Sequence, residues 1–370
     1  MMQPDFDVLV PAYVREFEPY IPSKPDPELM KLYGCPRLFR LNNNENPLGP
    51  PPAAQEVIRR FHPPRGAVYP SGDSYYLRQK IAEVHGLHPD QILVGNGANE
   101  VITFVIKAFC EKGDNIVTAD KTFAVYEWVA IFSGIEARIV PLKDERFDDL
   151  EMIRRIDART KILFVCNPNN PTGTYWGKDT LLRFLEEAGR NRIVVMDEAY
   201  FEFVEADDYP NGISLLKDYP NLVVFRTFSK MFGLAGLRIG YLAGEPSVVD
   251  MIRRTCVVYS VNSIAQEAAL AALSDETGHI QRTRHLVKES RAFLKEELSR
   301  MRLKTIANEG NYLIVRLPGS DTLAYRKLMR EGVMVRPMTG FRYPNHIRVT
   351  LAGMEAMEAL VAALKKTLTS

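Results

Sequence analysis

The chain has few cysteines, almost no net charge and no long apolar run, and each shortage excludes a class of protein. Its four cysteines, Cys35, Cys110, Cys166 and Cys256, form no C-x-x-C pair and no regular spacing, so free thiols are expected rather than a disulfide framework. The 47 basic and 46 acidic residues nearly cancel, which argues against a nucleic-acid or anionic-membrane surface. The first residues lack a basic region followed by an apolar core, and no stretch reaches the roughly 18 apolar residues of a membrane span. We therefore expect a cytoplasmic protein without a metal site, in which anions are bound only by local clusters.

The chain does have a regular alternation of short apolar runs and helical segments between about residues 75 and 245. The runs predict strands at 92–94, 116–118, 138–142, 161–166, 192–196, 222–228 and 237–242. The pattern predicts an α/β fold with a mostly parallel seven-stranded sheet and helices on both faces. Its ligand site should lie at the carboxyl ends of the strands.

The pattern of predicted helices and strands changes after residue 245. An amphipathic stretch at 262–302, strands at 312–317, 333–336 and 347–351, and a helix at 353–368 predict a smaller α+β domain. A chain of 370 residues is long enough for both units. We predict an N-terminal arm with part of the small domain at 1–52, a large domain at 53–260 and a small domain at 261–370.

The first 52 residues are proline-rich, which prevents a long helix. Tyr13, Phe17, Tyr20 and Leu29 give this arm apolar anchors, so it is expected to lie on the second domain or on a partner chain rather than to be a floppy tail.

Lys230 follows directly on the predicted strand at 222–228, with Thr227 and Ser229 before it and Arg238 eight residues after it. A lysine at a strand end is usually a solvated and idle residue. An amine among Ser, Thr and Arg at a buried strand end also suits a site where lysine forms an imine and an anion is held beside it. The second interpretation requires a carboxylate for a ring nitrogen, polar groups for a phenolic oxygen, a phosphate cradle and a stacking aromatic.

Candidates for all four follow other strands. Gly97, Ala98 and Asn99 open a helix after the strand at 92–94 and form a candidate phosphate cradle, although Glu100 stands where the third glycine of a dinucleotide fingerprint belongs. Asp197 ends a strongly apolar strand and suits a protonated ring nitrogen, with Glu198 as the competing acid. The remaining candidates are Asn170 and Tyr200 for the phenolic oxygen and Phe123 for stacking.

These residues resemble the class I/II, fold-type I, pyridoxal-phosphate aminotransferases along essentially the whole chain. The resemblance is carried by Asn-Asn-Pro-Thr-Gly at 169–173, Asp-Glu-Ala-Tyr at 197–200 and Ser-Lys-x-Phe-Gly-Leu-Ala-Gly-Leu-Arg at 229–238. Within the family, Pro-Tyr-Ile-Pro-Ser-Lys-Pro at 19–25, Asn-Glu-Asn-Pro-Leu-Gly-Pro at 44–50, Tyr-Pro at 69–70 and Gly-Asn-Gly-Ala-Asn-Glu at 95–100 are similar to the histidinol-phosphate aminotransferases.

The resemblance implies a role for each position. Lys230 would form the imine with pyridoxal 5'-phosphate, Asp197 would face the pyridine nitrogen, and Asn170 and Tyr200 would contact the phenolic oxygen. The other implied cofactor contacts are Gly97, Ala98, Asn99, Ser229 and Arg238 around the phosphate, Thr227 without a more specific role, Phe123 (or Tyr126) on the ring, and Tyr69 from the neighbouring subunit of a homodimer. The implied substrate contacts are Tyr20, Asn170, Arg336 and Arg348.

The implied reaction is ping-pong transamination through a Lys230 aldimine, with histidinol phosphate as amino donor and 2-oxoglutarate as acceptor. An aromatic amino-acid aminotransferase, a threonine-phosphate decarboxylase and a non-catalytic sensor of the cofactor remain as alternatives. No basic helix-turn-helix segment accompanies the site residues, which argues against the sensor.

Overall fold

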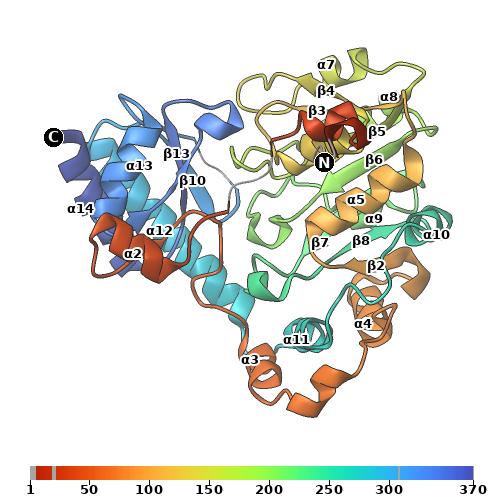
Figure 1. Ribbon diagram of the computed structural model, residues 1–370, viewed down its shortest axis with the longest axis horizontal. Helices are drawn as coiled ribbons and strands as arrows, with labels where there is room; N and C mark the ends of the chain where they lie inside the picture. The colour runs from red at the N-terminus through yellow and green to blue at the C-terminus, as the bar shows by residue number, and fades with distance from the viewer. Residues whose placement is uncertain (1–5, 19–21, 307–308, 370) are drawn as a thin grey trace, which may run out of the picture.

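A seven-stranded sheet forms the centre of the larger of two lobes (Figure 1). The computed structural model describes residues 6–18, 22–306 and 309–369. The strands are β2 (Ile92–Gly95), β3 (Asn115–Ala119), β4 (Glu136–Val140), β5 (Thr160–Cys166), β6 (Ile193–Asp197), β7 (Leu222–Thr227) and β8 (Gly240–Gly244). They lie in the order β2-β8-β7-β6-β5-β3-β4, and β8 alone runs opposite to the direction of the other strands. The predicted fold class is confirmed.

Both faces of this sheet are covered, because every residue of β3, β6, β7 and β8 is buried. The helices of this lobe are α3 (Pro52–Arg59), α4 (Tyr75–His85), α5 (Ala98–Phe109), α6 (Val125–Phe132), α7 (Asp149–Arg154), α8 (Lys178–Ala188), α9 (Gly212–Leu215) and α10 (Pro246–Arg253). Helix α11 (Ser263–Leu273) packs on α3 and α4. Within the described residues, no helix combines the length and apolarity needed to cross a bilayer.

The smaller lobe is built on an antiparallel sheet in the order β12-β13-β10-β9. Its strands are β9 (Thr305–Ile306), β10 (Tyr312–Arg316), β12 (Arg336–Pro337) and β13 (His346–Thr350). Helices α12 (His279–Arg300), α13 (Asp321–Arg330) and α14 (Met354–Thr369) accompany it in the cyan to blue part of the ribbon (Figure 1). The proposed domain boundaries at 52/53 and 260/261 stay a prediction.

The N-terminal arm contacts both lobes. It holds α1 (Ala12–Arg15) and α2 (Asp26–Tyr33), and Leu29 of α2 is buried against Met329 and Met334 of the small lobe. Phe17 packs edge-on against Phe132 of α6, with ring centroids 5.6 Å apart. The apolar anchors therefore bury part of the arm within its own chain.

Several sequence-derived bounds were wrong. Strand β8 begins at Gly240 instead of 237, because Ala235–Leu237 forms a 3-10 turn and Arg238 takes a φ of +56°. Strand β4 lies two residues earlier than 138–142. The predicted strand at 333–336 is two strands, because β11 (Val333–Met334) pairs with β1 (Phe39–Arg40) whereas β12 pairs with β13.

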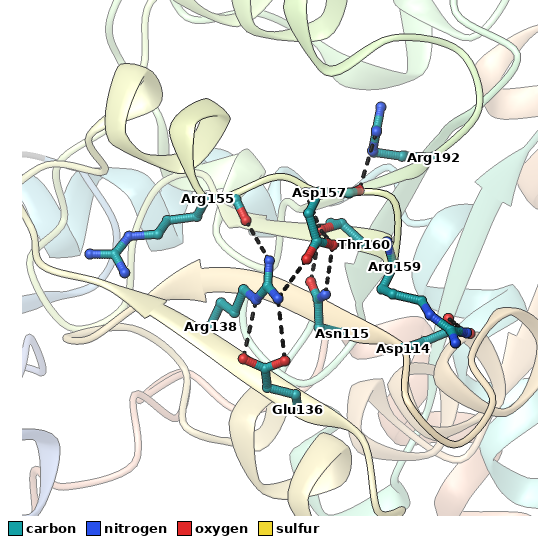
Figure 2. A network of polar contacts seen from close by, with 9 residues as sticks. All are labelled: Asp114, Asn115, Glu136, Arg138, Arg155, Asp157, Arg159, Thr160 and Arg192. Carbon is teal, nitrogen blue, oxygen red and sulfur yellow. Dashed lines mark hydrogen bonds and ion pairs between the residues drawn. The ribbon is translucent and has the colours of Figure 1, made fainter.

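The amino ends of the strands are joined by a network of polar contacts (Figure 2). At its centre Asp157 accepts hydrogen bonds from Asn115 Nδ2 (3.1 Å) and from the backbone N–H of Arg159 (2.8 Å), and it pairs with Arg138 Nη2 (2.7 Å). Thr160 Oγ1 donates to Asn115 Oδ1 at 2.8 Å. This network ties together the starts of β3, β4 and β5 at the edge opposite to their carboxyl ends.

Candidate active site

A cavity of about 380 Å³ opens at the carboxyl ends of β5, β6 and β7. These neighbouring strands are parallel, so the residues that follow them meet at one edge of the sheet. The cavity is lined by Asn43, Asn44, Glu45, Ala98, Asn99, Phe123, Cys166, Asn170, Asp197, Ala199, Tyr200, Thr227, Ser229, Lys230, Ala235, Arg238, Arg336, Phe341 and Arg348. Most of the residues predicted from the sequence are therefore brought together.

Lys230 lies three residues beyond the end of β7 and is half-buried in the cavity wall. Its Nζ donates a hydrogen bond of 2.7 Å to the backbone oxygen of Asn43. Burial and the nearby charge of Arg348 lower the pKa of Lys230 to about 7. A large fraction of this amine is therefore uncharged near neutral pH and can act as a nucleophile or a base.

The two candidate acids at the end of β6 have different surroundings. Asp197 lines the cavity, and its oxygens accept hydrogen bonds from Tyr126 Oη (2.5 Å) and from the backbone N–H of Ala199 (3.0 Å). Glu198 does not line the cavity. Its Oε2 is instead paired with Nη2 of Arg226 at 2.7 Å. Of the two acids, the cavity therefore receives only Asp197, the one favoured by the sequence.

The start of α5 and Arg238 form one wall of the cavity. Gly97 has a φ of +80°, and a Cβ at this position would run into the guanidinium of Arg238. Arg238 is held by bonds to Ala235 O (3.0 Å) and Ser229 Oγ (3.5 Å). The first N–H groups of α5, at Ala98 and Asn99, therefore face a space bordered by a fixed cation.

A second cation group comes from the small lobe. Arg348 of β13 donates to Asn170 Oδ1 (2.5 Å) and to Asn42 O (2.7 Å). Arg336 donates to Asn43 Oδ1 at 2.7 Å. The Nε atoms of both arginines are buried without a hydrogen-bond partner among the described residues. Both arginines line the cavity through other atoms of their side chains, because these two Nε atoms are themselves buried.

The aromatic candidates differ in whether they line the cavity. Phe123 lines the cavity, whereas Tyr126 is fully buried behind it. Tyr200 also lines the cavity, and its hydroxyl accepts a 2.9 Å hydrogen bond from Asn44 Nδ2. Tyr69 is 79% exposed, stacks on Tyr259 and does not line the cavity of its own chain. Tyr20 lies outside the described residues.

Sequence reasoning missed the segment that closes the cavity on the small-lobe side. Asn43, Asn44 and Glu45 line it, although the sequence analysis used the run at 44–50 as a family motif and gave none of these three residues a role in the site. The dense asparagines were the available signal, since Asn42 and Asn44 are buried and buried amides need partners. No local pattern indicated Ala199, Ala235, Cys166 or Phe341.

Comparison with known proteins agrees with this geometry. The family model described as aminotransferase class I and II matches residues 36–364. A protein of Anaeromyxobacter named histidinol-phosphate aminotransferase is 37% identical over 97% of this chain and 99% of its own length. A protein of Pseudomonas fluorescens named histidinol-phosphate aminotransferase 2 is 38% identical over 99% of both chains.

A solved structure of the same general shape is the histidinol-phosphate aminotransferase of Sinorhizobium meliloti in complex with pyridoxal-5'-phosphate. It matches with a TM-score of 0.86 at 24% identity, over 97% of each chain, and supports the fold. Since the family model covers most of the sequence and the relatives are similar along their whole length, the chain belongs to the class I and II aminotransferases.

Proposed function

We propose that the protein transfers the amino group of histidinol phosphate to 2-oxoglutarate, with pyridoxal 5'-phosphate as cofactor. The observation that carries the proposal is the cavity itself, in which Lys230 lies among Asp197, Arg238, Arg336 and Arg348. The names of the relatives favour histidinol phosphate as the amino donor.

The residues of the cavity fit this cofactor. The space that only a glycine permits at position 97 lets the backbone of Ala98 and Asn99 approach a phosphate group, and Arg238 and Ser229 supply charge and a hydroxyl. Thr227 supports Ser229 by accepting its backbone N–H at 3.1 Å. Asp197 would face the ring nitrogen, Asn170 and Tyr200 the phenolic oxygen, and Phe123 the ring face.

When bound, pyridoxal phosphate supplies a carbonyl carbon that exchanges amines and a ring that accepts electrons released at a substrate's α-carbon. Lys230 would provide the amine that holds this group, and its Nζ would carry the proton taken from the substrate's α-carbon. Its lowered pKa suits both tasks near neutral pH. The carboxylate of Asp197 would hold the proton of the ring nitrogen.

Arg348 and Arg336 would hold the substrate's anionic end. Histidinol phosphate carries a phosphate and no carboxylate, whereas glutamate carries two carboxylates, so one site has to accept both kinds of anion. The planar fork of arginine binds either group in bidentate fashion. The place of both arginines in the wall of the cavity supports such a role.

A homodimer is part of the proposal. Tyr69 lies outside its own cavity and close to other exposed apolar side chains, among them Val68, Tyr76 and Tyr259. This surface suits a second copy of the chain, into whose cavity Tyr69 would reach. Sedimentation of the purified protein tests this, because a monomer would leave Tyr69 without a role. The four free cysteines suit the cytoplasm, the location that we propose.

A panel of amino donors assayed with 2-oxoglutarate tests the proposed specificity. The purified protein should be yellow from its bound cofactor, and histidinol phosphate should be the preferred donor. Preference for phenylalanine would instead indicate an aromatic amino-acid aminotransferase. Release of carbon dioxide from threonine phosphate without formation of a keto acid would indicate a decarboxylase.

A further inference from the structure

Asp197 has a hydrogen-bond donor that plays no part in the function described so far. The Tyr126 hydroxyl of α6 lies 2.5 Å from Asp197 Oδ2, while Oδ1 accepts the backbone N–H of Ala199 at 3.0 Å. An O–H group at this distance from a carboxylate makes one of the stronger hydrogen bonds found in proteins. Each carboxylate oxygen is therefore held by one donor and keeps lone pairs for another.

The position of the Tyr126 hydroxyl is set by packing of its ring against two other aromatic rings. The ring stacks on Phe164 of β5, with centroids 4.8 Å apart and planes 12° apart. Phe123 meets it edge-on at 5.6 Å. Tyr126 is 0% exposed and does not line the cavity, so it touches Asp197 from behind. A fully buried tyrosine between two rings has little freedom to turn its hydroxyl elsewhere.

Few charged groups compete for the Asp197 carboxylate. Lys230 faces it across the cavity, Cys166 lies beside it at the end of β5, and Glu198 is paired with Arg226. Burial raises the pKa of Asp197, and the hydrogen bond from Tyr126, the Ala199 N–H and the charge of Lys230 act against that rise. Tyr126 is a neutral side chain whose hydrogen bond favours the ionised form of Asp197.

We propose that Tyr126 is a positioning residue that orients the Asp197 carboxylate toward the cavity and holds it ionised, so that the cofactor's ring nitrogen keeps its proton. This inference rests on the proposed role of Asp197. Without the hydroxyl, the proton shared between the carboxylate and the ring nitrogen moves toward the carboxylate, and the ring becomes less positive. A less positive ring would make the nitrogen that joins Lys230 to the cofactor more basic, so this nitrogen would lose its proton at a higher pH.

Tyr126→Phe tests the proposal, because it removes the hydroxyl and keeps the stacked ring. In the cofactor-loaded protein, we expect the pH-dependent change in cofactor absorbance to move to higher pH by roughly half a unit to one unit. The dissociation constant of the cofactor should rise roughly three- to thirtyfold. Tyr241→Phe is the matched control, since Tyr241 is also buried but its hydroxyl bonds to His85 Nε2 at 2.7 Å, away from the cavity.

Asp197→Asn separates the inference from the role on which it rests. This variant should shift the absorbance further than Tyr126→Phe and lose roughly 10²–10³-fold or more in kcat, and adding Tyr126→Phe to it should change nothing further. If Asp197→Asn shifts the titration and Tyr126→Phe titrates like the unmodified protein, the positioning role is overturned and Asp197 keeps its own. If Asp197→Asn itself behaves like the unmodified protein, both assignments fail. An equal shift of the titration midpoint in Tyr241→Phe would mean that loss of any buried hydroxyl loosens the core enough to produce it. This result would also overturn the proposal.

Discussion

The two ends of the large sheet use similar residue types in opposite ways. At the amino ends, acids and bases neutralise each other: Asp157 and Glu136 both pair with Arg138, and Asp114 lies 3.7 Å from Arg159 (Figure 2). At the carboxyl ends, Lys230, Arg238, Arg336 and Arg348 outnumber the two acids of the cavity, Glu45 and Asp197. A self-paired network joins strands, whereas an excess of cations around a cavity binds anions. Changes at one end should therefore affect catalysis, and changes at the other end should affect only stability.

Replacing Lys230 should have the largest effect. Lys230→Ala should abolish covalent attachment of the cofactor and turnover, because no other lysine lines the cavity among the described residues. Absorbance after borohydride treatment and the transamination assay measure both losses. Lys217→Ala, at an exposed position outside the cavity, is the control. A Lys230→Ala protein with normal activity would refute the assignment.

Arg348→Lys should have the next largest effect on activity. Lysine keeps the positive charge but lacks the planar fork of arginine. One edge of that fork donates to Asn170, and another edge could bind a substrate anion. Losing one charged hydrogen bond should lower kcat/KM roughly 10- to 100-fold for both glutamate and histidinol phosphate. Steady-state kinetics with each donor measures the loss. An unchanged kcat/KM for both donors would remove Arg348 from the substrate site.

The pH dependence of cofactor capture should follow Lys230. Because its pKa is lowered to about 7, the uncharged fraction falls roughly tenfold for each pH unit below that value. The rate at which cofactor-free protein turns yellow should therefore rise with pH and level off above about 7. Arg348→Gln should move this midpoint to higher pH, because the charge of Arg348 helps to lower the pKa. A rate that keeps rising through pH 9 in the unmodified protein would contradict the lowered pKa.

Thr160→Val should test the opposite end of the sheet. Thr160 is 3% exposed, donates to Asn115 Oδ1 and accepts the backbone N–H of Asp157 at 3.0 Å. Valine keeps the shape and the strand preference, so the loss of these bonds should lower the free energy of unfolding by about 1–3 kcal/mol with kcat/KM unchanged. Urea unfolding measures this loss. Thr118→Val, with a single bond to the backbone of Phe164, should cost less; a large loss of activity in Thr160→Val would break the contrast between the two ends.

Asp157→Asn should have the smallest effect. Hydrogen bonds from Asn115 and the pairing with Arg138 hold the pKa of Asp157 below its usual range. A carboxyl group with a lowered pKa stabilises the fold above its ordinary pKa, and this contribution disappears as the pH falls through the folded value. The melting temperature of Asp157→Asn should therefore be slightly lower than that of the unmodified protein at pH 7, and the difference should shrink below about pH 4. A difference that grows on acidification would give the opposite sign and rule out this role.

The α/β fold could be predicted from the sequence, because seven apolar runs alternating with helical segments leave few other arrangements. It also indicated Lys230, Asp197, Asn170 and Arg238, since each is a polar residue at or just beyond a buried strand end. It placed the strand at 237–242 too early, because local apolarity does not reveal the left-handed turn at Arg238.

The neighbours of these residues could be identified only in the folded molecule. Asn43, Asn44 and Glu45 come to the cavity from a distant segment, as shown by the bond from Lys230 to Asn43, which lies 187 residues earlier in the chain. The choice between Phe123 at the cavity and Tyr126 behind it depends on how α6 lies on β5. The lowered pKa of Lys230 likewise depends on burial and on Arg348, which the chain brings in from the other lobe. Periodicity specifies which face of a strand or helix is apolar, but contacts between distant segments exist only once the chain is packed.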